Sequence, residues 1–332
     1  MVLSVAYKRE DGYNQGSVKC RTQPTCTEMD VLSKILSKRS PLILDGAMGT
    51  ELQRRDVDTG LPLWSANALI AHPEVVLQIH KDYIAAGADI ITTNTFRTTR
   101  RTLRRANLPD RSMQLTANAV ELAQKARESF ADREILIAGS IAPLEDCYRP
   151  DLVPSDAELR EEHTELAERL ASANVDFIIL ETMNTVREAY AACSAAKLTG
   201  KEVMVSFICN KEGNLYSGER LSGAIKTIAE LRPVAFSINC VSPRYLEPAI
   251  TNLKRQTSLP FAVYGNVGLP ESEKHGWEFT HDIQEEEYTK YARQWHRSGA
   301  SIIGGCCGTT PEYIGAIANA LLTKQQRETQ IP

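Results

Sequence analysis

The chain has 332 residues, of which 42% are hydrophobic, 24% charged and 6% aromatic. This composition is typical of a soluble globular protein and excludes collagen-like and intrinsically disordered chains. The 38 lysine and arginine residues are balanced by 42 aspartate and glutamate residues, so the formal net charge is -4. Because no overall positive field attracts a polyanion, we expect no nucleic-acid partner.

Residues 1–30 are polar and aperiodic, and we expect them to form a flexible N-terminal arm. They lack the continuous apolar stretch of a secretory signal. No other segment approaches the roughly 18 to 20 apolar residues of a membrane helix. We therefore expect a cytoplasmic protein without a membrane partner, in which residues 31–325 form the single folded domain.

Short apolar or β-branched segments alternate with amphipathic segments from Pro41 onward. Eight of them have the pattern of buried strands: 41–45, 88–93, 135–140, 176–181, 203–208, 234–239, 260–265 and 300–305. Helical periodicity is found between them, at 73–87, 112–130, 156–174, 185–200, 221–232 and 285–300. Gly87, Gly200 and Gly299 stand where helix C-caps are expected.

This alternation predicts a parallel sheet covered by helices, and eight units in a chain of this size match a (β/α)8 TIM barrel. A doubly wound open sheet is the alternative. Such a sheet normally has a glycine-rich phosphate motif after its first strand, and the sequence contains neither G-x-G-x-x-G nor G-x-x-x-x-G-K-[ST]. We therefore predict a single-domain (β/α)8 barrel.

Three cysteines stand where strands end, which is where barrels of this class place their active sites. Cys240 follows the sixth predicted strand, and Cys306 and Cys307 follow the eighth, so we expect their thiols to converge. Three thiolates form an open Zn²⁺ site, because zinc prefers four tetrahedral ligands and one position stays free. We interpret Cys193 and Cys209, which lie elsewhere, as buried apolar residues.

At this point the sequence resembles the homocysteine-binding zinc methyltransferases, which include S-methylmethionine-, betaine- and cobalamin-dependent enzymes. The segments that carry the resemblance are LDGAMGTEL (44–52), GADIITTNTF (87–96), INC (238–240) and IIGGCCGTTP (302–311). The resemblance extends over roughly residues 38–322. It implies a (β/α)8 barrel, zinc on Cys240, Cys306 and Cys307, and the thiolate of homocysteine as the fourth ligand and methyl acceptor, which gives methionine.

The resemblance also implies four residues that bind homocysteine: Asp45, Gly46, Thr93 and Glu181. Backbone N–H groups near Gly46 suit a carboxylate, and Glu181 would meet the ammonium group. From the residues alone, Glu181 has the alternative of a structural ion pair in the barrel mouth. Asp45 has the alternative of a turn cap.

The methyl donor is the least defined part of the sequence-based prediction. LPLWSANALI (61–70) resembles the S-methylmethionine branch, and a sulfonium cation is attracted by aromatic faces, for which Trp64, Tyr148 and Trp277 are candidates. Ordinary packing is the alternative for each ring. S-Methylmethionine and S-adenosylmethionine are the favoured donors. Betaine or another donor, a selenohomocysteine or selenocysteine acceptor, and a barrel lyase or hydrolase with a cysteine nucleophile remain open, as does the oligomeric state.

Overall fold

The computed structural model describes residues 31–38, 41–267, 270–272, 278–279 and 282–322. The predicted N-terminal arm, residues 1–30, lies outside the described residues, as does the end of the predicted domain beyond residue 322. The division at residues 30 and 31 therefore stays a prediction. In the part of the chain that is described, no helix combines the length and apolar character needed to cross a membrane.

Eight parallel strands form the central sheet in the order β1-β10-β7-β6-β5-β4-β3-β2. Their bounds are Leu42–Ile43 (β1), Ile90–Thr92 (β2), Leu136–Ile141 (β3), Phe177–Met183 (β4), Val203–Phe207 (β5), Ala235–Asn239 (β6), Phe261–Gly265 (β7) and Ile302–Gly305 (β10). A parallel bridge between Leu44 and Ile90 joins β1 to β2 and closes the ring. A separate antiparallel pair is made by Pro270–Ser272 (β8) and Glu278–Phe279 (β9). The predicted (β/α)8 barrel is confirmed, with all eight of its strands.

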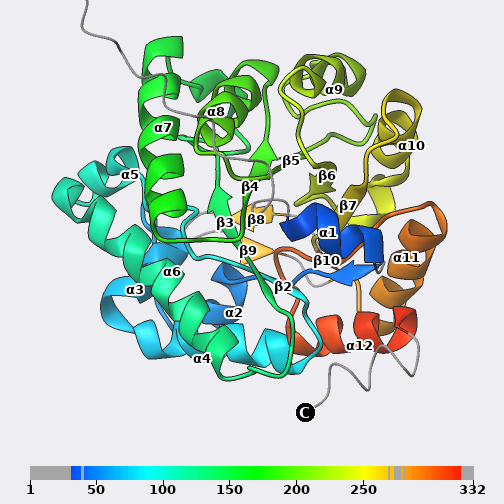
Figure 1. The fold of residues 1–332 in the computed structure, drawn as a ribbon, viewed down its shortest axis with the longest axis horizontal. Helices are drawn as coiled ribbons and strands as arrows, with labels where there is room; N and C mark the ends of the chain where they lie inside the picture. The colour runs from blue at the N-terminus through cyan, green and yellow to red at the C-terminus, as the bar shows by residue number, and fades with distance from the viewer. Residues whose placement is uncertain (1–30, 39–40, 268–269, 273–277, 280–281, 323–332) are drawn as a thin grey trace, which may run out of the picture.

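Helices surround the barrel on all sides (Figure 1). The six predicted ones are Pro73–Ala85 (α4), Ser112–Glu128 (α6), Asp156–Ser172 (α7), Val186–Leu198 (α8), Leu221–Ala229 (α9) and Glu285–Arg297 (α11). The others are Val31–Lys38 (α1), Gly49–Arg54 (α2), Ala68–Ala71 (α3), Arg100–Arg105 (α5), Glu247–Gln256 (α10) and Pro311–Leu321 (α12). Gly87, Gly200 and Gly299 have φ values of 110°, 80° and 100°, as expected just after a helix.

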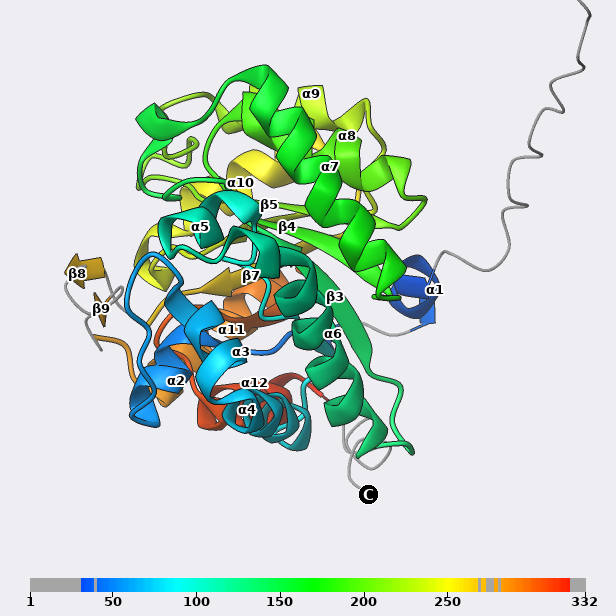
Figure 2. The same ribbon diagram turned by 90° about the vertical axis from the view of Figure 1, so that its left-hand side faces the viewer.

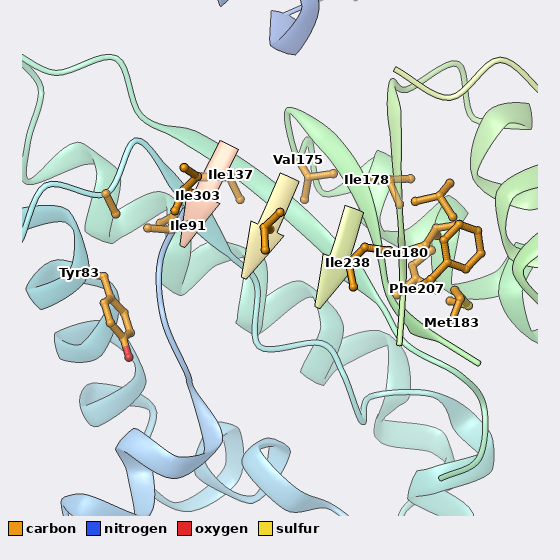
Figure 3. Packing of buried hydrophobic residues seen from close by; sticks show 14 of the residues in the cluster. Tyr83, Ile91, Ile137, Val175, Ile178, Leu180, Met183, Phe207, Ile238 and Ile303 are labelled. Atoms are coloured by element: carbon orange, nitrogen blue, oxygen red, sulfur yellow. The ribbon is translucent and has the colours of Figure 1, made fainter. Parts of the chain in front are cut away.

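Alternating side chains along the strands build two separate apolar layers. Leu42 and Leu44 point into the barrel, where they pack with inward residues of the other strands, whereas Ile43 points outward to the helices. Figure 3 shows part of the outer layer, with Ile91 of β2 and Ile137 of β3 on neighbouring strands. Because both faces of every strand are buried, the strand ends are held in a fixed register. That register positions the residues at the mouth of the barrel.

Helix α1 closes the N-terminal end of the barrel. Leu32 and Ile35 are buried among the inward-facing strand residues. The carboxylate of Glu202, just before β5, accepts hydrogen bonds from the backbone N–H of Leu32 (2.7 Å) and of Ser33 (3.1 Å). A carboxylate at a helix N-terminus satisfies otherwise unpaired N–H groups and suits the helix dipole. Figure 2 shows α1 at the end of the barrel opposite the β8–β9 pair.

Candidate active site and metal centre

A pocket opens at the C-terminal ends of the strands, opposite α1. The residues that line it include every predicted site residue within the described part of the chain, together with several that were not predicted. They include Asp45, Gly46, Trp64, Thr93, Asn94, Phe96, Cys147, Tyr148, Glu181, Thr182, Asn239, Cys240, Tyr264, Cys306 and Cys307. Trp277, the remaining predicted residue, lies outside the described residues.

The three cysteine sulfurs gather in this pocket. The Sγ atoms of Cys240, after β6, and of Cys306 and Cys307, after β10, all lie within 4.8 Å of one another. Four sulfurs arranged tetrahedrally at 2.3 Å around zinc would lie about 3.8 Å apart. The donor set and its spacing therefore fit a metal ion that prefers sulfur and keep one coordination position open. Cys240 has a φ of 56°, a left-handed conformation that is uncommon for a residue other than glycine.

Small residues let the loop after β10 lie directly against the loop after β1. A Cβ on Gly304 would lie 2.7 Å from the carbonyl oxygen of Leu44, and one on Gly46 would lie 2.7 Å from Oγ1 of Thr309. The same Oγ1 donates a hydrogen bond of 2.7 Å to the carbonyl oxygen of Cys306. Glycine at these positions thus brings the cysteine pair close to the predicted homocysteine-binding loop.

Ionisation within the cysteine cluster is shared. The pKa of Cys240 is lowered well below its ordinary value because the thiols of Cys306 and Cys307 donate hydrogen bonds to its sulfur. The Oη atom of Tyr148, 3.6 Å from this sulfur, adds to the effect. The pKa values of Cys306 and Cys307 are raised, since their protons are held by the Cys240 sulfur. These directions place negative charge on the Cys240 sulfur in preference to the other two, and a divalent metal held by the three sulfurs would displace their remaining protons.

Glu181 lies in β4 at the mouth of the barrel, and no ion pair to it occurs among the described residues. Its Oε2 accepts a hydrogen bond of 2.5 Å from Oγ of Ser140. Burial raises the pKa of Glu181 to about 7, against the lowering effect of this hydrogen bond, and the negative charge of Cys240 raises it further. A partly exposed carboxylate at the pocket wall, without a cation beside it among the described residues, disfavours the alternative of a structural ion pair. It suits a ligand that brings its own positive charge.

Asp45 and Thr93 are engaged with neighbouring strands. The Asp45 carboxylate accepts hydrogen bonds from the backbone N–H (2.7 Å) and Oγ1 (3.0 Å) of Thr92. Thr95 donates its single hydroxyl proton to the carbonyl oxygen of Ser140 (2.6 Å), so in the 2.9 Å contact between the two hydroxyls Thr93 is the donor. The Thr93 hydroxyl has no proton left for a ligand. Both residues therefore fix the mouth of the barrel, whatever contact they make with substrate.

Aromatic rings form another part of the pocket wall. Trp64 has a φ of 50° and packs with Phe96 and Tyr148. A Cβ added to Gly49 would collide with the Trp64 indole, so the ring lies directly on the backbone of that residue. Tyr148 also meets Tyr216 edge to face, with ring centroids 5.6 Å apart. The predicted rings Trp64 and Tyr148 thus lie in one cluster, beside the cysteines.

Several residues of the pocket wall were not singled out from the sequence. Asn94 and Phe96 lie inside the motif 87–96, and Asn239 directly precedes Cys240. Their only sequence signal is this proximity. Cys147, in the loop after β3, was given no role from the sequence, but it lines the same pocket and is 2% exposed, and burial raises the pKa of its thiol. Tyr264, the residue before the end of β7, points into the barrel, which the strand alternation could have indicated.

The comparisons with known proteins agree with this geometry. Residues 42–321 match the family described as homocysteine S-methyltransferase. The homocysteine S-methyltransferase YbgG of Bacillus subtilis is 33% identical over 87% of this chain and 97% of its own length. The selenocysteine Se-methyltransferase of Brassica oleracea is 32% identical, over 85% and 89%. The crystal structure of the metallated homocysteine methyltransferase MmuM from Escherichia coli superposes with a TM-score of 0.76, at 31% identity over 87% of this chain and 99% of that one. The chain therefore belongs to the homocysteine S-methyltransferase family.

Proposed function

We propose that this protein is a zinc-dependent methyltransferase that transfers a methyl group from a sulfonium donor to the thiol of homocysteine, giving methionine. S-Methylmethionine and S-adenosylmethionine are the donors proposed. The observation that carries the proposal is the cluster of three sulfurs in a pocket that also holds Glu181, a carboxylate with no ion-pair partner among the described residues. Membership of the family supports homocysteine as the acceptor.

Cys240, Cys306 and Cys307 are the residues that would hold the metal. Soft sulfur ligands favour zinc over magnesium or calcium, and three of them leave the fourth position open. Bound zinc would supply Lewis-acid chemistry, lowering the pKa of the acceptor thiol so that it reacts as a thiolate near neutral pH. Because three free thiols need a reducing compartment, we place the reaction in the cytoplasm.

Glu181 is proposed to bind the ammonium group of homocysteine. A hydrogen bond that involves a charged group contributes about 1.5 to 3 kcal/mol, which sets the expected loss of affinity on removing it. The backbone N–H of Gly46 is proposed to bind the carboxylate of the acceptor, and Asp45, whose own N–H donates to the carbonyl oxygen of Ile90 (2.9 Å), is proposed to hold this loop in place. Thr93 supports this arrangement indirectly, because its Oγ1 accepts a hydrogen bond of 3.0 Å from the backbone N–H of Ser140, the residue that bonds to Glu181.

Trp64, Phe96 and Tyr148 are proposed to hold the donor. The face of an aromatic ring attracts a sulfonium cation by about 0.5 to 2 kcal/mol. The acceptor thiolate attacks the methyl carbon in line, a new S–C bond forms, and the C–S bond of the sulfonium breaks. The electron pair of that bond stays on the departing sulfur, which leaves as a neutral thioether. The reaction therefore needs no general acid.

Parallel assays with the zinc-loaded protein test the proposal. Homocysteine is supplied with S-methylmethionine, S-adenosylmethionine or betaine, and methionine is measured. We expect one or both sulfonium donors to support turnover and chelation of zinc to abolish it. Turnover with betaine alone would refute the assignment of a sulfonium donor. Methylation of selenocysteine but not of homocysteine would refute the assignment of homocysteine as the acceptor. Activity that survives removal of the metal but not alkylation of Cys306 or Cys307 would favour a cysteine nucleophile.

A further inference from the structure

The backbone of β4 is irregular beside Glu181. Pairing between β4 and β5 is regular up to Leu180, shifts, and resumes at Met183. Thr182, within this irregularity, has a φ of 53° and is 1% exposed. A left-handed conformation is strained for any residue other than glycine and is especially unfavourable for a β-branched residue. The position of Glu181 therefore depends on contacts that hold its neighbour in this conformation.

Asn239 supplies such a contact from the end of β6. Its Oδ1 accepts hydrogen bonds from the backbone N–H of Thr182 (3.1 Å) and from Oγ of Ser206 (2.7 Å). These two donors fix the orientation of the amide. Its Nδ2 has no hydrogen-bond partner among the described residues, although Asn239 is 1% exposed. The next residue in the chain is Cys240. Asn239 therefore holds the backbone beside Glu181 with its side chain and directly precedes a residue of the cysteine cluster.

We infer that Asn239 is a positioning residue that sets the separation between the ammonium-binding carboxylate and the metal-binding sulfurs. This inference rests on the proposed function, because it assigns the ammonium of the acceptor to Glu181 and its sulfur to the cluster at Cys240. The thiol and the amino group of homocysteine are joined by a short chain of fixed length. Both ends can be held together only if the carboxylate stays at the matching distance from the metal.

The first test compares Asn239→Ala with Ser206→Ala, in zinc-loaded full-length protein. Ser206→Ala is the matched control, because it removes the other donor to the same Oδ1 and keeps the bond to Thr182. The acceptors are homocysteine and 4-mercaptobutyrate, which has the same chain without the amino group. For Asn239→Ala we expect full zinc content, a KM for homocysteine raised about tenfold and an unchanged affinity for 4-mercaptobutyrate. For Ser206→Ala we expect a KM for homocysteine within about twofold of the wild type.

The second test uses Thr182→Gly and Glu181→Gln. Glycine adopts a positive φ without strain, so the double variant Asn239→Ala/Thr182→Gly should regain most of the homocysteine affinity lost in Asn239→Ala. If Asn239 acts through Glu181, adding Asn239→Ala to Glu181→Gln should change the KM for homocysteine little further.

The outcomes separate this inference from the function on which it rests. Loss of zinc in Asn239→Ala, or equal weakening for both thiols, would mean a merely structural role and would overturn the inference. An effect of Glu181→Gln on homocysteine, together with none of Asn239→Ala, would overturn the inference alone. Unchanged homocysteine affinity in Glu181→Gln would refute the proposed role of Glu181 and the inference with it.

Discussion

Homocysteine binding is expected to release protons from two sources, and Glu181→Gln separates them. Burial places the pKa of Glu181 at about 7, so at pH 6 about nine-tenths of the empty pockets hold a protonated carboxyl. Pairing with an ammonium group requires the ionised form and so releases about 0.9 proton. The acceptor thiol, with an ordinary pKa near 8.5, releases about one more on binding the metal. The wild type should therefore release about 1.9 protons at pH 6, and Glu181→Gln about 1.0.

The raised pKa of Glu181 also determines how proton release and homocysteine affinity change with pH. At pH 8 Glu181 is already ionised before binding, and its contribution to the proton release falls to about 0.1. Between pH 6 and pH 8 the homocysteine affinity of the wild type should therefore rise about tenfold more than that of Glu181→Gln. Calorimetric titration of the zinc-loaded proteins in buffers of different ionisation enthalpy counts the protons. If the wild type and Glu181→Gln released equal numbers of protons at pH 6, the proposed ionisation of Glu181 on homocysteine binding would be refuted.

Four further outcomes are expected. Cys240→Ala should lose both zinc and activity. Cys209→Ala, at a buried thiol outside the pocket, should keep both. Full zinc content in Cys240→Ala by elemental analysis would show that Cys240 does not bind the metal. X-ray absorption should count three sulfurs and one lighter ligand around zinc before homocysteine is added, and four sulfurs at about 2.3 Å afterwards. Trp64→Leu should raise the KM for a sulfonium donor about 2- to 30-fold without weakening homocysteine binding, and an equal loss for both substrates would count against a donor role. Glu202→Ala should lower the free energy of unfolding by about 1 to 3 kcal/mol, because two N–H groups of α1 lose their acceptor, and urea unfolding at unchanged m-value measures this.

The barrel strands were predictable because each is buried on both faces and reads as a short apolar run. Glycines at 87, 200 and 299 marked the helix ends for a local reason, since their positive φ follows from the way helices terminate. Helix α1 had no such signal. It is eight residues long, and the carboxylate that caps it lies 170 positions away in the chain. A contact of that kind depends on the completed fold.

The site likewise contains features that could be predicted from the sequence and features that could not. Convergence of Cys240 with the 306–307 pair follows from parallel strands, whose carboxyl ends meet at one face of a barrel. The support of Glu181 by Asn239 does not follow from any local pattern, because threonine is among the least expected residues at a positive φ. Phe96 was likewise missed, since nothing in its own segment indicates that it packs with Trp64 from a different loop.

Closure of the barrel by α1 leaves substrates and products a common entrance. The cysteine cluster and Glu181 lie where the strands end, whereas Trp64, Phe96 and Tyr148 belong to the segments that follow β1, β2 and β3. We expect a donor held by these rings to bind over the homocysteine site, on its solvent side. Turnover is therefore expected to be ordered, with homocysteine entering first and methionine leaving last. Methionine would then compete with homocysteine for the empty enzyme, a pattern that product-inhibition kinetics can detect.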